Sequence, residues 1–189
     1  MKDDLLEQFM GYCQQQPHLF ADFHLVDEAK GKSLLASLLG SQTATHFTVI
    51  GKHASDSLIA RWTAEELNPA PPPYVWLDSE GSPNSVFATT TTEFLSLLPF
   101  DTGAVYDIIS SWTYYLAEPT NYAPPAEKYQ GERLTAYFIS AKNTYPAYSA
   151  FLAWLKDTLG ISPALDPVGL IGNAIQKYPN LEEWLKNKK

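Results

Sequence analysis

A block of strand-like sequence between segments of helical periodicity is the feature that most constrains the fold. Phe47–Ile50 and Leu58–Trp62 predict two strands. Tyr74–Leu77 and Ser85–Ala88 predict a hairpin, because the residues between them are rich in turn formers. Phe20–Val26 is a further candidate strand. We therefore predict an α+β fold, with a mixed or antiparallel sheet flanked by helices and a helical C-terminal half.

Apolar residues at helical spacing surround this block. They predict helices over Asp3–Gln16, over Ala104–Leu116, and from Pro146 to a stop at Gly160. Two more helices are expected near 168–177 and 180–187. Ser33–Leu39 is a short Leu-rich run that fits a helix or a strand equally well.

Two helix starts carry capping signals. Thr90-Thr91-Thr92-Glu93 fits a capping box, in which Thr90 caps the third amide of the helix and Glu93 reaches back. Asp101 or Thr102 is expected to cap the next helix. The extended, proline-rich connection Asn68–Pro73 has few main-chain donors for a sheet.

The chain has 189 residues, about the size of one domain. We expect residues 1–100 to form the α+β region, with residues 101–189 as a mostly helical extension that packs on it in one compact unit. A single cysteine and scattered aromatic residues permit a dimer without favouring one.

Charge narrows the classes of partner. The chain has 21 acidic and 13 basic residues, a formal charge of -8, which opposes binding to nucleic acid or to anionic membranes. A basic protein partner is electrostatically favoured. The sequence begins with no signal-peptide pattern and holds no apolar run of membrane-spanning length, so we predict a cytoplasmic protein.

No residue pattern predicts catalysis, a metal site or a cofactor. Gly31-Lys32-Ser33 lacks the upstream glycine of a phosphate-binding loop, and no Gly-x-Ser-x-Gly elbow is present. The four histidines lack zinc-site spacing. His24 and His46 are expected within strands and His53 in a solvated loop, and Cys13 is expected to be a packed thiol.

The candidate binding residues are carboxylates on predicted turns and tyrosines beside a proline-rich loop. Asp78 and Glu80 are expected on a solvated turn. Tyr114 and Tyr129 fit either packing against the loop or an interaction surface. The full set of candidate partner-binding residues is Asp56, Glu65, Glu66, Asp78, Glu80, Tyr115 and Tyr122.

Residues 46 to about 98 resemble the SUKH superfamily, which contains yeast-type cell-wall synthesis regulators and many bacterial immunity proteins. The resemblance rests on an Ile-Gly turn, a strand with aromatic residues, a proline-led strand that ends in Ser-Glu-Gly, and a Glu-Phe-Leu helix. In this chain these are Phe47-Thr48-Val49-Ile50-Gly51, Leu58-Ile59-Ala60-Arg61-Trp62, Pro73 to Gly81, and Thr92 to Leu98. The turn Lys52–Ser57 is less rich in glycine and acid than is usual for the family.

The resemblance implies a protein that acts by binding and has no catalytic residues. The leading hypothesis is a bacterial immunity protein that occludes a toxin domain, such as a basic nuclease. A second is an intracellular regulator or scaffold that uses the Pro- and Tyr-rich segment 114–130. A third is an enzyme or small-molecule binder with a cleft between the two halves.

Overall fold

The computed structural model describes residues 4–16, 19–20, 22–67 and 71–188. Its centre is a five-stranded antiparallel sheet whose strands lie in chain order, each paired with the next. The strands are β1 (Phe23–Leu25), β2 (Phe47–His53), β3 (Leu58–Trp62), β4 (Tyr74–Leu77) and β5 (Ser85–Ala88). The predicted α+β fold is confirmed, and the sheet is antiparallel.

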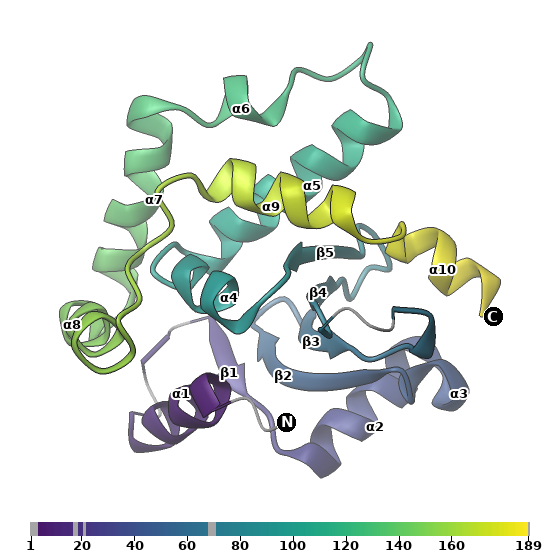
Figure 1. Cartoon of the computed structure of the whole chain (residues 1–189), viewed down its shortest axis with the longest axis horizontal. Helices are drawn as coiled ribbons and strands as arrows, with labels where there is room; N and C mark the ends of the chain where they lie inside the picture. The colour runs from purple at the N-terminus through teal and green to yellow at the C-terminus, as the bar shows by residue number, and fades with distance from the viewer. Residues whose placement is uncertain (1–3, 17–18, 21, 68–70, 189) are drawn as a thin grey trace.

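Helices cover both faces of this sheet, and most of the C-terminal half is helical (Figure 1). None of the helices in the described part of the chain is long and apolar enough to cross a membrane. The helices, including the 3-10 turn η1, are α1 (Asp4–Gln15), α2 (Glu28–Leu39), α3 (Ser41–Ala44), η1 (Glu65–Leu67), α4 (Thr91–Leu97), α5 (Thr102–Ala117), α6 (Pro125–Lys128), α7 (Gly131–Thr144), α8 (Tyr148–Leu159), α9 (Pro167–Lys177) and α10 (Leu181–Asn187).

Strands β3, β4 and β5 are buried on both faces because their side chains are apolar at nearly every position. On one face, Tyr74 and Trp76 join a core with residues of α1, α4, α5, α8 and α9. On the other face, Trp62 and Val75 pack with residues of α2, α9 and α10. The first core contains residues from both sides of position 100.

Local sequence signals explain where several helices begin. Thr90 Oγ1 accepts a hydrogen bond from Glu93 N at 3.1 Å, as predicted, but the Glu93 carboxylate accepts from Thr89 N at 2.6 Å rather than from Thr90. Asp101 caps α5 by accepting from Gly103 N at 2.9 Å. Gly160 ends α8 in the left-handed region with φ 67°, as expected for a glycine stop.

Other predictions needed correction. Ser33–Leu39 belongs to α2, which begins at Glu28 because Asp27 caps it. The strand predicted over Phe20–Val26 is limited to β1, and His46 lies in the turn before β2 rather than in a strand. Residues 68–70 of the predicted proline-rich connection, and also His18, lie outside the described residues.

Gly51 is the position where β1 and β2 approach most closely. A Cβ atom at Gly51 would lie inside the ring of Phe23 and 2.8 Å from the carbonyl oxygen of His24. Phe23 is 2% exposed and belongs to the core, so a shift of its ring would disturb its packing. The glycine therefore allows β1 to approach β2 this closely.

We predict that Gly51→Ala lowers the free energy of unfolding by about 1–3 kcal/mol, because it overpacks the contact between β1 and β2. Gly11→Ala is the matched control, since no heavy atom lies within 4 Å of its added Cβ atom. In helix α1 that change should stabilise by about 0.5–1 kcal/mol. Urea unfolding measures both variants, and equal stability of Gly51→Ala and the native chain would contradict the packing.

Candidate functional site

Two turns meet at one end of the sheet and bring three of the candidate carboxylates together. The turn between β2 and β3 holds Asp56, and the turn between β4 and β5 holds Asp78 and Glu80. Ser79 joins the turns, because its hydroxyl donates to the Ser55 carbonyl oxygen at 2.7 Å. In contrast, Glu65 and Glu66 lie in η1, after the far end of β3. The five predicted carboxylates therefore do not form one surface.

Asp78 is buried, and the expectation of a solvated side chain is wrong for it. Only 5% of the residue is exposed. Its Oδ1 accepts from Glu80 N at 2.9 Å, and its Oδ2 accepts from the Ser57 hydroxyl at 3.3 Å. The buried Asp78 carboxylate therefore stabilises the turn through hydrogen bonds, while Glu80 on the same turn is exposed.

Other candidate carboxylates are exposed but already paired. Asp56 Oδ1 lies 2.5 Å from Lys52 Nζ. Glu66 accepts a hydrogen bond from Lys188 Nζ at 2.7 Å, which is the main reason that the pKa of Glu66 falls to about 2. Exposed ion pairs of this kind hold little free energy, so a competing partner could replace either cation.

The tyrosines divide between packing and exposure. Tyr122 is 45% exposed, and its ring stacks on that of Tyr114, with the ring centroids 5.6 Å apart. Tyr115 is half-buried and packs edge-on against Trp112. Tyr129 is buried and donates its hydroxyl to the Asp107 carbonyl oxygen at 2.9 Å. Tyr114 and Tyr122 are thus the accessible pair.

Tyr106 connects this pair to the end of the sheet. Its ring lies 5.3 Å from that of Trp76 on β4. Burial and the nearby Asp78 carboxylate raise the pKa of Tyr106. Tyr114 follows eight residues later, about 12 Å along α5 and about 80° around its axis. Tyr106 is not among the binding residues predicted from the sequence, and only its place in the same helix as Tyr114 points to it.

The same region contains carboxylates without basic residues. Between Trp62 and Glu127 the sequence has nine acidic residues and no Lys, Arg or His. We call the exposed part of this region the α5 face and define it as Glu80, Tyr106, Tyr114, Glu118 and Tyr122. All five except the half-buried Tyr106 are exposed. The nine acidic residues are Glu65, Glu66, Asp78, Glu80, Glu93, Asp101, Asp107, Glu118 and Glu127.

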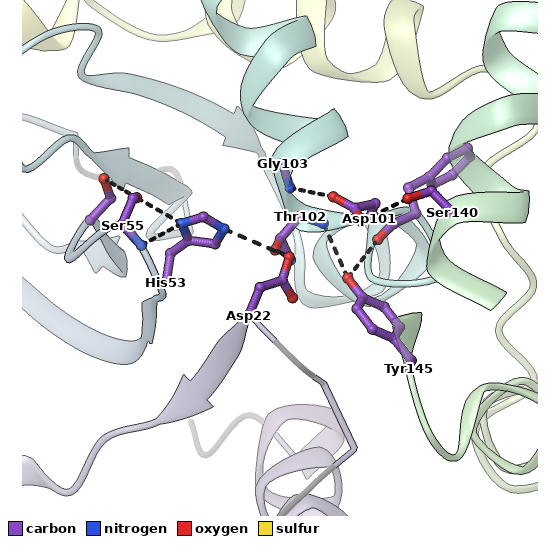
Figure 2. A network of polar contacts seen from close by, with 10 residues as sticks. Asp22, His53, Ser55, Asp101, Thr102, Gly103, Ser140 and Tyr145 are labelled. Atoms are coloured by element: carbon purple, nitrogen blue, oxygen red, sulfur yellow. Dashed lines mark hydrogen bonds and ion pairs between the residues drawn. The ribbon is translucent and has the colours of Figure 1, made fainter. Parts of the chain in front are cut away.

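A polar network fixes the start of α5 against the sheet (Figure 2). Asp22 Oδ2 accepts a hydrogen bond from the Thr102 hydroxyl and lies 3.7 Å from His53 Nε2. Tyr145, after α7, accepts from Thr102 N at 3.1 Å. The His53 side chain is only 14% exposed, so the expectation of a solvated loop histidine is wrong. Its partner Asp22 is 31 positions away in the sequence.

The Asp22 carboxylate carries its charge in the folded protein. Burial alone would raise the pKa of Asp22, but hydrogen bonds from His53 and Thr102 hold it below its ordinary value. The ionised form is therefore the one that stabilises the folded state.

Asp22, His53 and Ser55 resemble the order of a hydrolytic triad, but their bonding favours a structural role. The Ser55 hydroxyl lies 2.7 Å from His53 Nδ1. The main-chain N–H of Ser55 donates to the same nitrogen at 3.1 Å, and the Ser55 hydroxyl also bonds Ser57 at 3.1 Å. Because the lone pair on Nδ1 is already engaged, this histidine is poorly placed to take a proton from Ser55.

Two hollows lie between residues 1–100 and 101–189. One hollow, of about 470 Å³, lies beside the start of β5, the end of α5 and the helix α10. The other, of about 380 Å³, lies between α4 and α9. The carboxylates in the second hollow have structural partners, because Glu93 binds Thr89 and Asp166 caps α9 through Gly169 N at 2.8 Å.

The remaining candidate groups show no reactive arrangement. Cys13 is buried, as predicted, and burial raises the pKa of its thiol to about 12. Within the described ranges, no three His, Cys, Asp or Glu side chains lie together as metal ligands. Comparison with protein-family models, with curated proteins and with solved structures found no match to the chain.

We predict that Asp22→Asn lowers the free energy of unfolding by about 2 kcal/mol at neutral pH, because it removes the charge from a partly buried hydrogen-bonded group. The folded pKa of Asp22 lies below the unfolded value, so its contribution is complete above about pH 4 and disappears as the pH falls through the folded pKa. Urea unfolding of both proteins from pH 7 to pH 2 measures this difference.

Asp56→Asn is the control for this prediction, because Asp56 is exposed and paired only with Lys52. Its effect should stay below about 0.5 kcal/mol. A difference between native chain and Asp22→Asn that stays constant down to pH 2 would contradict the role assigned to the Asp22 charge.

Proposed function

We propose that this chain is a non-enzymatic binding module and that its α5 face receives a basic protein partner. The observation that carries the proposal is the exposed, stacked pair Tyr114 and Tyr122 in a sequence segment, residues 62–127, that has nine carboxylates and no basic residue, although Lys128 bonds Ser111 on the same helix. Tyrosines supply large contact area at low conformational cost and are enriched at binding hot spots. Neighbouring carboxylates favour Lys and Arg on the partner, including cation–π contacts with the exposed rings.

The immunity protein is the most specific form of this proposal. The resemblance of residues 46–98 to the SUKH superfamily and the formal charge of -8 support it. A nuclease toxin needs a basic surface to hold phosphate, and an acidic inhibitor is attracted to such a surface. Because a toxin of this kind acts inside the cell, we also propose a cytoplasmic location.

A regulator or scaffold is the second candidate function. The loop of residues 118–124 holds Pro119, Tyr122 and Pro124, a composition suited to recognition of several partners. The two functions differ in the number of partners: an immunity protein binds one toxin tightly, whereas a regulator binds several proteins of its own cell.

Co-purification at two salt concentrations tests the proposal. The tagged chain should retain one stoichiometric basic protein at low salt and lose most of it at high salt, since exposed charges are screened. Several partners would favour the regulator. A single acidic partner, or a partner whose retention is independent of salt, would contradict binding through the α5 face.

We predict that Tyr114→Ala with Tyr122→Ala weakens partner binding by at least about 2 kcal/mol, a typical hot-spot loss. The melting temperature should fall by less than about 4 °C, because both rings are nearly half exposed in the free protein. Calorimetric titration and thermal unfolding measure the two quantities.

Tyr115→Ala is the control, because Tyr115 packs against Trp112. It should lower the melting temperature by more than the double variant does, and it should weaken partner binding by less. If the double variant binds as tightly as the native chain, the stacked tyrosines have no part in recognition.

A further inference from the structure

Strand β1 covers only part of the outer edge of β2. The paired residues of β2 are Gly51, Lys52 and His53, and one further hydrogen bond joins Val26 N to the Ile50 carbonyl oxygen at 3.4 Å. After Val26 the chain leaves the sheet, because Asp27 caps α2. The part of β2 from Phe47 to Val49 therefore has a neighbouring strand, β3, on one side alone.

The main chain of Phe47 and Val49 points away from β3. Thr63 N donates to the His46 carbonyl oxygen at 2.8 Å, which places the main chain of His46 toward β3. Because direction alternates along an antiparallel strand, Thr48 also faces β3, and Phe47 and Val49 face the open edge. Apart from the pairing of β2 within the sheet, the main-chain N–H and C=O groups of Phe47 and Val49 make no hydrogen bond to other described residues.

A cavity of about 510 Å³ lies along this open edge. The four consecutive residues Phe47 to Ile50 line it. Helix α1 contributes Leu6 and Met10 to its wall, and helix α2, which runs alongside β2 in Figure 1, contributes Gly31 and Leu35. The result is a largely apolar groove with main-chain donors and acceptors at its base.

We propose that this groove binds an extended segment of a partner protein, which adds to β2 as a strand in line with β1. An extended peptide segment can form main-chain hydrogen bonds with the N–H and C=O groups that a strand edge presents at every second residue. The internal strand β1 already pairs with the same edge from Gly51 onward, and a β-bulge between Val49 and Gly51 separates that ladder from the one that the added strand would form.

The groove also sets the length and character of that segment. The three residues from Phe47 to Val49 extend over about 10 Å, so about three residues of the partner can pair there. Side chains that alternate between the two faces would meet Leu6 and Met10 on one side and Leu35 on the other. Apolar residues at alternating positions are therefore favoured. This site is separate from the α5 face and does not depend on the function proposed for it.

Hydrogen exchange of the free protein is the first test. The amides of Phe47 and Val49 should exchange at least tenfold faster than that of Thr48, whose N–H faces β3. Exchange of Phe47 and Val49 that is as slow as that of Thr48 would show that the edge is already closed, and would overturn the proposal.

The second test uses 12-residue peptides selected from a random display library on the full-length chain. A selected peptide should slow exchange at Phe47 and Val49 at least tenfold. It should also bind Val49→Pro at least tenfold more weakly than Val49→Ala, because proline removes the outward N–H while alanine keeps it. Both variants replace the Val49 side chain, so the main difference between them is whether residue 49 keeps its main-chain N–H.

Failure to select any peptide that protects these two amides would overturn the proposal. Equal binding to the two Val49 variants would overturn it as well. If Val49→Pro does not fold, the exchange measurement on the native chain decides alone. Peptides that instead lose binding in Tyr122→Ala would identify the α5 face as their site, which counts against the groove and leaves the proposed function standing.

Discussion

The hydrogen bond from Thr102 to the Asp22 carboxylate determines where α5 begins relative to the sheet. Thr102 is the first residue of α5, and Asp22 lies directly before the edge strand β1 and beside His53 at the end of β2. One carboxylate thus ties a helix to two strands at their shared end. Because α5 is one continuous helix of 16 residues, fixing its start also helps to position Tyr106 against Trp76 of β4 and Tyr114 farther along the helix.

Buried and exposed carboxylates perform different tasks in this molecule. Asp22 accepts a hydrogen bond from Thr102 and lies beside His53 at the sheet end, and Asp78 accepts two hydrogen bonds that organise its turn. Glu80 and Glu118 are exposed, and Glu118 lies one helical turn from Tyr114. The negative charge of the chain alone does not separate these roles. Burial and hydrogen bonding do, and they leave the α5 face as the surface where charge and aromatic area coincide.

Local sequence was sufficient for most strands and for several helices, but it did not predict α7 (Gly131–Thr144), and it was insufficient for the long-range contacts. The strands Leu58–Trp62 and Tyr74–Leu77, the cap at Thr90 and the stop at Gly160 follow from residues that are neighbours in sequence. The burial of His53 depends on Asp22, and the burial of Asp78 depends on Ser57, so neither could be read from nearby residues. The approach of β1 to β2 likewise depends on the distant Gly51, whereas the end of β1 follows from the nearby cap at Asp27.

A charge-reversal measurement on the α5 face tests its role in binding most directly. Glu80→Lys with Glu118→Lys is compared with Glu65→Lys with Asp157→Lys, which makes the same change of net charge on exposed residues elsewhere. With the co-purified partner at low salt, the first pair should slow association by about tenfold or more, because steering depends on where the charges lie. The second pair should have a much smaller effect. Equal slowing by both pairs would show that only net charge matters, and would contradict the assignment of binding to the α5 face.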